Sequence, residues 1–259
     1  MFIEERHQAI LTHLNQIGRI TASEIQDMFQ VSFDTARRDL RILEENGLLK
    51  RTHGGALPMK PIGFSKPPKM TAKDISEVKD NYFAIAMKAV SMIKPNDVIF
   101  LTSATVGYFM AQNLPKDIKI TVVVNSIIIA EELRKYDNLR VIVTGGEMDN
   151  KGIFYDSFTC EMIRRIRFDK CFITAACISA DFGLSIQRSG GVGFLNAVID
   201  SSKSVIGLFP TEKIGFESVM SICPANKLNY LITDWDASKK DLKKFDELGI
   251  QTVIVEKEN

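Results

Sequence analysis

Apolar residues in the first part of the chain recur at the spacing of an amphipathic helix. Between residues 2 and 17 an apolar residue returns every three or four positions, which predicts a helix that Gly18 ends. A second, shorter apolar group over residues 25–29 predicts another helix, capped by Thr21 or Ser23. The apolar positions of these two helices are Ile10, Leu11, Leu14, Ile17, Ile25, Met28 and Phe29.

A third helix and a hairpin are predicted next. Ser32 is a good N-cap, and the helix is expected to run to about Asn46, with Gly47 ending it. The face expected to pack on the first two helices carries Phe33, Ala36, Leu40 and Leu43. Residues 48–56 alternate between apolar and polar and end in a glycine pair, which is typical of a two-stranded wing. Residues 1–57 are therefore predicted to form a winged helix-turn-helix domain.

A proline-rich segment follows this domain. Four of the eight prolines and three lysines are interleaved there: Pro58, Lys60, Pro61, Lys66, Pro67, Pro68 and Lys69. Because proline lacks a backbone N–H and disfavours helix in the residue before it, residues 58–72 are predicted to be a stiff, extended, basic linker. The linker separates the first domain from a second one over residues 73–259.

The second domain alternates strand-like and helix-like segments. Seven short β-branched runs are nearly continuously apolar, which is typical of strands buried on both faces. They cover residues 98–101, 119–124, 140–143, 170–175, 205–209, 230–233 and 251–255. Amphipathic stretches over residues 75–92, 106–113, 127–135 and 239–248 lie between many of them. This alternation predicts an α/β domain with a mainly parallel sheet.

Composition narrows the classes of function. The net charge of +1 gives no overall attraction to nucleic acid or membrane, so an argument for DNA binding has to rest on local charge. The cysteines (Cys160, Cys171, Cys177 and Cys223) form no CxxC pair and lie far from the three histidines, so neither a metal nor a cofactor is predicted. The segment from Cys171 to Cys177 is interpreted as core, in preference to a redox site. The start is polar, and no apolar run reaches the roughly 18 residues of a membrane span, which predicts a cytoplasmic protein.

Basic residues are concentrated late in the first domain. The side of the third helix opposite its apolar face carries Asp34, Arg37, Arg38 and Arg41, and the wing adds Lys50, Arg51 and His53. Residues 1–58 hold seven Lys/Arg against eight Asp/Glu, so a positive face comes from clustering and not from an excess. Arginine can donate two hydrogen bonds to guanine and can bind phosphate. A solvated helix face is the alternative, which the helix spacing, the cap and the basic wing together disfavour.

Two runs resemble the DeoR-type family of bacterial transcription regulators. Residues 31–40 read Val-Ser-Phe-Asp-Thr-Ala-Arg-Arg-Asp-Leu, and residues 49–56 read Leu-Lys-Arg-Thr-His-Gly-Gly-Ala. They match the family's VS-x-x-T-x-RRDL recognition helix and its R-x-HGGA wing. The resemblance implies double-stranded operator DNA as a partner, contacted by Ser32, Thr35, Arg37 and Arg38 with support from Arg41, Arg51 and His53. The alternative for His53 is a side chain that stabilises the turn beside Gly54.

The second domain is similar to the C-terminal domain of the same family, which resembles ribose-5-phosphate isomerase and the coenzyme A transferases. The matching landmarks are residues 97–101, 121–126, 143–146, 168–172 and 231–234. The resemblance implies a sensor for a phosphorylated sugar or a related metabolite. It also implies a homo-oligomer that binds repeated half-sites, with contacts through this domain.

The chain departs from the family where a ligand is expected. Family members carry D-S-G-T-T after the first strand of the domain, and residues 102–106 here read Thr-Ser-Ala-Thr-Val. Such a junction can still receive an anion through its backbone N–H groups. The Cβ of Ala104, however, restricts positive φ and is expected to hold the backbone away from a ligand. Farther along, the family's acids and basic pair are replaced by Gly190, Gly191, Leu195 and Asn196.

The candidate effector site is assembled from segments that follow predicted strands. Its members are Ser103, Ala104, Thr105, Asn125, Gly145, Gly146, Arg188 and Lys213. Arg188 and Lys213 are replacement anion partners in what we expect to be an altered or weakened site. The alternative for Arg188 is a solvated loop arginine, and the alternative for Gly145-Gly146 is a plain turn.

These features predict a sequence-specific DNA-binding regulator. The resemblance implies that it is a repressor of an operon for carbohydrate uptake or catabolism, relieved by the metabolite. One alternative is an isomerase-like enzyme with an appended DNA-binding arm. An isomerase needs a carboxylate base near a polarising donor. The loop region has lost its acids, and nothing marks Asp156 or Asp181 as catalytic, so no enzyme activity is predicted. The other alternative is a regulator whose sensor domain has lost its response to small molecules.

Overall fold

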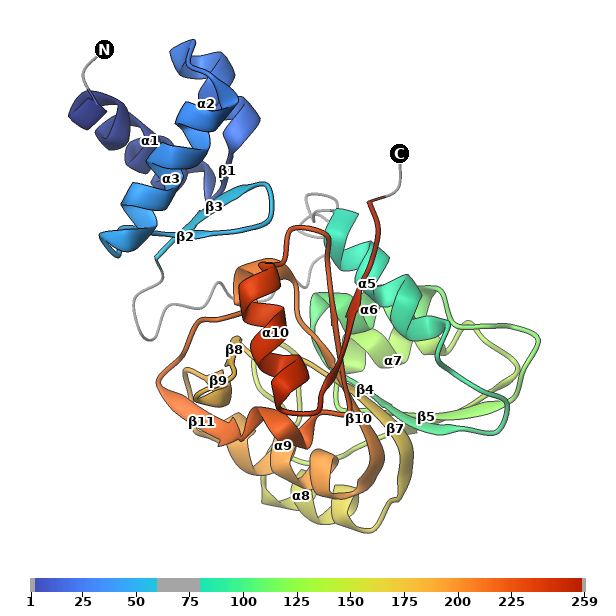
Figure 1. Ribbon diagram of the computed structural model, residues 1–259. Coiled ribbons are helices and arrows are strands. Elements are labelled where there is room, and N and C mark those ends of the chain that lie inside the picture. Colours follow the sequence, from blue (N-terminus) through green and yellow to red (C-terminus); the bar gives the residue numbers. More distant parts are fainter. Residues whose placement is uncertain (1–2, 60–79, 258–259) are drawn as a thin grey trace. The chain divides into compact units, whose positions relative to one another are not determined.

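The structure is a computed structural model that describes residues 3–59 and 80–257, so most of the predicted linker lies outside the described residues. The described residues form two compact units (Figure 1), one centred on residues 3–59 and the other on residues 80–235 and 241–257. Each unit has its own buried apolar core.

The smaller unit contains three helices and a three-stranded antiparallel sheet. Its elements are α1 (Ile3–Ile17), β1 (Ile20–Thr21), α2 (Ala22–Phe29), α3 (Phe33–Glu45), β2 (Leu49–Arg51) and β3 (Gly55–Pro58). Thr21, one of the two predicted caps, begins α2 with a capping box. Its hydroxyl accepts the N–H of Glu24 at 3.1 Å, and the Glu24 carboxylate accepts the N–H of Thr21 at 2.6 Å. Ser32 caps α3 as predicted, by accepting the N–H of Thr35.

The core of the smaller unit follows the helical periodicity with three exceptions. The side chains of Ile10, Leu14, Ile25, Ala36, Leu40 and Leu43 are at most 2% exposed. Phe33, predicted to pack on the first two helices, is instead 44% exposed at the first position of α3. Ile17 and Met28, near the ends of their helices, are 62% and 47% exposed. The prediction that Phe33 packs on the first two helices is therefore wrong.

The wing has one strand more than predicted. β1 pairs with β3, placing Ile20 opposite Ala56 and Thr21 opposite Gly55. A Cβ on Gly55 would overlap the carbonyl oxygen of Ile20, whereas one on Gly54 would meet open space. Glycine at position 55 is therefore what allows the two backbones to approach.

The larger unit is built on a seven-stranded sheet. In spatial order its strands are β13 (Gln251–Ile254), β12 (Tyr230–Thr233), β10 (Ser202–Leu208), β7 (Phe168–Ile173), β4 (Val98–Leu101), β5 (Ile120–Val124) and β6 (Leu139–Val143). Every pairing in this sheet is parallel. The predicted α/β fold with a mainly parallel sheet is confirmed.

Helices cover both faces of this sheet (Figure 1). One face carries α5 (Asp80–Val90), α6 (Thr105–Gln112) and α7 (Ile127–Leu133), and the other carries α8 (Ser157–Arg164), α9 (Gly190–Asp200) and α10 (Lys239–Glu247). Neighbouring residues of β4 show the two layers. Leu101 belongs to the core cluster beneath α5 and α6, whereas the Phe100 ring packs edge-on to Phe194 of α9, 5.7 Å between centroids. Burial on both faces explains the nearly continuous apolar runs.

Some elements of the larger unit have no counterpart in the sequence prediction. They are the three-stranded antiparallel sheet of β8 (Cys177–Ser179), β9 (Gly183–Ile186) and β11 (Met220–Cys223), the short turns η1 (Thr211–Lys213) and η2 (Ala225–Lys227), and helices α8 and α9. The first turn of α9 contains three glycines, and each disfavours helix by about 1 kcal/mol relative to alanine. Burial of Phe194, Ala197 and Val198 stabilises the helix nonetheless.

Candidate nucleic-acid interface and effector site

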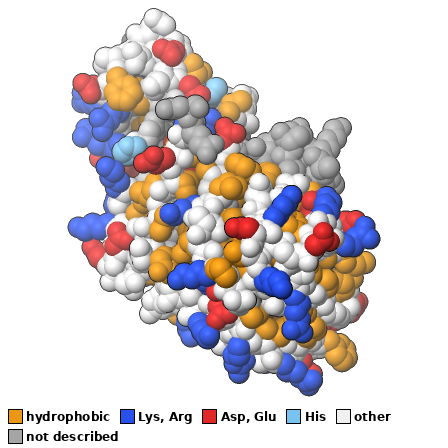
Figure 2. Space-filling view, turned by 90° about the vertical axis from the view of Figure 1, so that its right-hand side faces the viewer, with side chains coloured by type: hydrophobic (Ala, Val, Ile, Leu, Met, Phe, Trp, Pro, Cys, Tyr) orange, Lys and Arg blue, Asp and Glu red, His pale blue; other side chains and the backbone are white. Residues whose placement is uncertain are grey.

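The outward side of α3 carries a row of cations. Arg37, Arg38 and Arg41 are all exposed, and the opposite side of the helix is core. In the space-filling view, Lys and Arg side chains of the smaller unit gather along one border beside a histidine (Figure 2). Spacings of three and four residues place the arginines on one helix face. A recognition helix needs this arrangement to bring arginines to base edges and phosphates.

The first turn of α3 holds two hydroxyl groups in a cap. Ser32 Oγ accepts the N–H of Thr35 at 3.1 Å and lies 2.8 Å from Thr35 Oγ1. Ser32 is exposed and Thr35 is half-buried. A hydroxyl oxygen has two lone pairs, so each keeps the capacity for a further hydrogen bond. The cap thus fixes these hydroxyls at the helix end that would enter a groove.

Two of the arginines have partners on α3 itself. The guanidinium carbon of Arg37 lies 6.0 Å from the centroid of the Phe33 ring, within reach of a cation–π contact. Arg41 Nε lies 3.9 Å from Glu45 Oε1, and these side chains are 58% and 67% exposed. An exposed pair of this kind contributes at most about 1 kcal/mol, so Arg41 can exchange its partner for a phosphate.

The wing is attached to α3 through a hydrogen bond. Glu44 Oε1 accepts the backbone N–H of Arg51 at 2.9 Å. Lys50 and Arg51 are half-buried on β2, and His53 is exposed in the turn that follows. The structure therefore places His53 at the surface, where both of its predicted roles stay predictions.

Asp39, the acid of the Arg-Arg-Asp-Leu run, points inward, which the sequence reasoning missed. It is 1% exposed, and its carboxylate accepts Arg6 Nε at 2.6 Å and Arg6 Nη2 at 3.1 Å. His7 Nε2 lies 3.1 Å from the same carboxylate. The hydrogen bond from Arg6 to Asp39 raises the pKa of Arg6 above its ordinary value. The available signal was helical spacing, because position 39 lies on the apolar face and a buried acid there requires a basic partner.

In the larger unit, the strand order reverses between β4 and β7. From β4 the chain moves outward through β5 to β6, and from β7 it moves the other way through β10 and β12 to β13. In open parallel sheets, ligands bind beyond the carboxyl ends of the strands at such a switch point. The segments there are residues 102–104 after β4 and residues 174–176 after β7.

Lys213 reaches the switch point from the β10 side. Its Nζ lies 3.3 Å from Oγ1 of Thr174, the residue that directly follows β7. Of the other candidate residues, Ser103, Ala104 and Thr105 follow β4. Asn125 follows β5, the strand next to β4 in the sheet. Asn125 is 2% exposed and donates Nδ2 to the Phe154 carbonyl at 2.8 Å, while its buried Oδ1 has no hydrogen-bond partner among the described residues. The structure thus places these candidates at adjoining strand ends.

A buried acid network lies at the neighbouring strand ends and was also missed. Asp234, directly after β12, is 0% exposed and accepts Thr211 N at 2.8 Å, Thr211 Oγ1 at 2.6 Å and Asn81 Nδ2 at 3.0 Å. Burial and the nearby Glu212 raise the pKa of Tyr82. An aspartate directly after an apolar run was the available signal. With three hydrogen bonds to its carboxylate, Asp234 holds α5 and η1 to the strand ends.

Two family profiles together cover most of the chain. A DeoR-like helix-turn-helix domain matches residues 6–61, and a DeoR C-terminal sensor domain matches residues 79–235. The chain belongs to the DeoR family. The match extends over both units, including α3, the wing and the switch point of the sheet.

Curated DeoR-type relatives align with nearly the whole chain. The HTH-type transcriptional regulator GolR of Listeria innocua is 30% identical over 262 residues, covering 99% of this chain and 100% of its own. The HTH-type transcriptional repressor GlcR of Bacillus subtilis is 31% identical over 261 residues, covering 100% and 98%. The L-fucose operon activator of Haemophilus influenzae is 28% identical over 252 residues, covering 96% and 99%.

Membership in the DeoR family settles the general function. DeoR-family regulators are non-enzymatic DNA-binding proteins. This chain is accordingly a DNA-binding transcription regulator, with a helix-turn-helix domain that binds operator DNA and a C-terminal sensor domain. The predicted DNA-binding regulator is confirmed.

The departure from the DeoR pattern at Ala104 does not strain the loop. Ala104 caps α6 with φ −103° and ψ 170°, an extended conformation that any residue adopts. The expectation that its Cβ would matter through positive φ is therefore wrong. The crowded position is Gly107, where a Cβ would overlap the carbonyl oxygen of Thr102. Glycine there lets α6 pack against the loop after β4.

Gly145 and Gly146, which follow edge strand β6, are in contact with residues at the start of α8. Thr159 Oγ1 donates to the Gly145 carbonyl at 2.7 Å, and Asp156 caps α8 by accepting the N–H of Thr159 at 2.8 Å. Gly146 has φ +133°, and a Cβ there would crowd the Asp156 carboxylate. Backbone N–H donors, first that of Glu147, lower the pKa of Asp156. These contacts support the plain-turn interpretation of the pair.

Arg188 is exposed on the segment before α9. A Cβ on Gly190, two residues after Arg188, would come within 3.0 Å of the Tyr155 ring, so this segment lies beside Tyr155. Tyr155 follows Phe154, the residue bonded by Asn125. The segment that carries Arg188 therefore lies near the segment that Asn125 contacts, and the predicted role of Arg188 stays a prediction.

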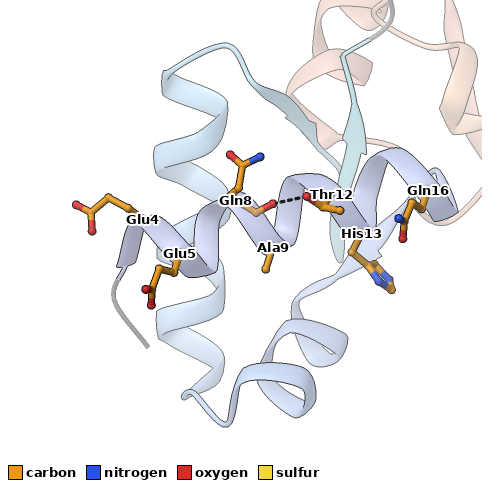
Figure 3. Close-up of a pocket in the computed structure, with 7 residues that line it drawn as sticks. All are labelled: Glu4, Glu5, Gln8, Ala9, Thr12, His13 and Gln16. Atoms are coloured by element: carbon orange, nitrogen blue, oxygen red, sulfur yellow. Dashed lines mark hydrogen bonds between the residues drawn. The ribbon is translucent and has the colours of Figure 1, made fainter.

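An open hollow along α1 has no relation to these sites. It is lined by Glu4, Glu5, Gln8, Ala9, Thr12, His13 and Gln16 (Figure 3). All of them come from one helix, and Thr12 Oγ1 donates to the Gln8 carbonyl at 2.9 Å, a bond within that helix. A ligand site has polar groups that converge in a concave pocket. The hollow is therefore the solvated face of α1.

Within residues 3–59 and 80–257, no three His, Cys, Asp or Glu side chains are grouped as a metal site requires. None of the helices in these ranges is long and apolar enough to cross a bilayer. All the cysteines are free and buried. Burial raises the pKa of Cys171 to about 12 and that of Cys223 to about 11, so both thiols stay protonated at neutral pH. The burial of Cys171 and Cys177 supports the interpretation of their segment as core.

Proposed function

We propose that this DeoR-family protein represses an operon for carbohydrate uptake or catabolism, and that a phosphorylated sugar or related metabolite releases it from the operator. The observation that supports effector binding is the position of the Lys213 ammonium group beside Thr174 at the switch point. A lysine among loop backbone donors suits a phosphate. GlcR is named a repressor, whereas one relative is named an L-fucose operon activator. That this protein represses its operon, and does not activate it, is therefore part of the proposal.

Operator recognition is assigned to α3 and the wing. Its residues are Ser32, Thr35, Arg37, Arg38, Arg41, Lys50, Arg51 and His53. Arg37→Ala combined with Arg38→Ala is expected to abolish specific binding and to leave the fold intact, because both side chains are exposed. The probe is a duplex that the wild-type protein selects from a random DNA pool.

The affinity for this duplex is measured by titration at several salt concentrations. The slope of the logarithm of affinity against the logarithm of salt concentration should become shallower by about 0.9 for each phosphate contact that is lost. Arg19→Ala is the matched control, because Arg19 is exposed but lies between α1 and β1. Unchanged affinity of the double variant would refute the assignment.

The effector site is tested by calorimetry with a panel of sugar phosphates. At least one is expected to bind the wild type, and Lys213→Met is expected to weaken that binding at least about tenfold through the lost ion pair. Lys227→Met is the control, because Lys227 is an exposed lysine of η2 in the same unit. Binding that survives Lys213→Met would overturn the assigned site. Failure of the whole panel would favour a regulator that has lost its small-molecule response.

We also propose a cytoplasmic homo-oligomer, because repeated half-sites require two or more copies on the DNA. Phe83 and Met87 of α5 are 38% and 37% exposed, and Phe83 packs edge-on to Phe109 of α6, 5.8 Å between centroids. Apolar surface of this kind is commonly covered in oligomers. Replacing Phe83 and Met87 by serine should lower the sedimentation coefficient, whereas Lys88→Ser should not. Equal sedimentation of all three proteins would exclude this face.

A further inference from the structure

Phe33 occupies the first position of α3 and lies outside the core. It is 44% exposed, whereas Ala36 and Leu40 on the packed side are 0% and 2% exposed. Phe33, Arg37 and Arg41 follow one another at intervals of four residues, which places them in one row along the helix. The guanidinium carbon of Arg37 is 6.0 Å from the Phe33 ring centroid. An aromatic ring therefore begins the cationic face of α3.

We propose that Phe33 reads a thymine in the operator, through contact between its ring and the thymine 5-methyl group in the major groove. The proposal rests on the assignment of α3 as the recognition helix. In that docking, the N-terminal residues of the helix meet the base edges. Among the base groups exposed in the major groove, the thymine methyl is the apolar one, and phenylalanine is one of the side chains that contact it.

Arg37, one helical turn after Phe33, would contact the base pair next to the thymine. Side chains one turn apart on a helix lie about 5–6 Å apart at their Cβ atoms, so Phe33 and Arg37 would meet neighbouring base pairs. Contact with the ring restrains the guanidinium group, whose paired donors match O6 and N7 of guanine. The recognised step is therefore a thymine next to a guanine.

The test replaces thymine by uracil, one position at a time, in the duplex that the wild-type protein selects. This exchange removes a single methyl group and keeps every hydrogen-bonding group of the base. For the wild type, one position per half-site should lose affinity about fourfold, the loss expected when one methyl contact disappears. Phe33→Ser should bind the thymine duplex more weakly and should no longer distinguish uracil at that position.

Phe158→Ser is the matched control, because Phe158 is 75% exposed on α8 of the other unit. It should keep the wild-type preference for thymine. If no uracil exchange affects the wild type, or if Phe33→Ser keeps the same preference, the role of Phe33 is overturned. If no duplex is selected, or if the Arg37 and Arg38 double variant binds normally, the assignment of α3 itself fails. The two failures are thus distinguishable.

Discussion

Arg6 of α1 and Asp39 of α3 form a two-point ion pair, with Arg6 Nε 2.6 Å from Asp39 Oδ2 and Arg6 Nη2 3.1 Å from Asp39 Oδ1. Their side chains are 11% and 1% exposed. The pair joins the first helix to the recognition helix on the side away from the exposed arginines. Because Arg6 neutralises Asp39 inside the unit, the outer face of α3 stays cationic.

Removing one partner of this pair should destabilise the smaller unit. Asp39→Asn is expected to cost about 3–5 kcal/mol, because Arg6 is left buried without its counter-ion. The chain's single tryptophan, Trp235, lies in the larger unit, so its fluorescence would report on that unit. Hydrogen exchange of the α3 amides therefore measures the loss of stability in the smaller unit. Glu45→Gln, which breaks only the exposed pair with Arg41, should change protection by less than about 1 kcal/mol. Similar losses in both variants would contradict the buried role of Asp39.

The capping box of α2 gives a second prediction. Thr21→Ala removes the hydroxyl that accepts the Glu24 N–H and should lower the stability of the smaller unit by about 1 kcal/mol. Thr12→Ala is the control, because Thr12 is exposed within α1 and should shift stability by no more than about 0.5 kcal/mol. Exchange protection of α2 amides distinguishes the two. Equal effects would show that the cap does not stabilise α2.

Two helical glycines should respond oppositely to alanine. Gly107→Ala places a Cβ against the Thr102 carbonyl oxygen and should cost about 1–3 kcal/mol. Gly193→Ala meets open space within α9 and should stabilise by about 0.5–1 kcal/mol, because alanine favours helix. Denaturant unfolding followed by Trp235 fluorescence reports on the larger unit. If both substitutions shifted the unfolding free energy in the same direction, the close approach of Gly107 to Thr102 or the open space at Gly193 would be contradicted.

Alkaline pH should weaken the larger unit through Cys171. Burial raises the pKa of this thiol from 9.0 to about 12, so between these values the unfolded chain releases a proton that the folded chain retains. The stabilisation is fully present below pH 9 and is lost as pH rises toward 12. The difference in unfolding free energy between wild type and Cys171→Ala should fall by up to about 1.4 kcal/mol per pH unit. A difference that does not change between about pH 8 and pH 10.5 would refute the buried thiol.

Local patterns in the sequence determined much of this protein. The cap at Ser32, the outward arginines of α3 and the strands β4 and β12 are where the periodicity predicts them. Each depends on residues within a few positions of one another, through hydrogen bonds of one turn or alternation along one strand. The residues that carry the DeoR resemblance belong to the same class, which is why the DNA-binding function could be predicted.

Contacts between distant segments were decided only by the tertiary structure. Arg6 meets Asp39, Asn81 meets Asp234, and Lys213 meets Thr174 across intervals that no local pattern spans. The glycine-rich start of α9 has low helix propensity, and burial overrides it. Phe33 is likewise exposed although it is apolar, because it lies at the start of α3, before the first buried residue of that helix, Ala36. Burial and strand order are collective properties of the fold, so the sequence determined which side chains were available and the tertiary structure decided which of them meet.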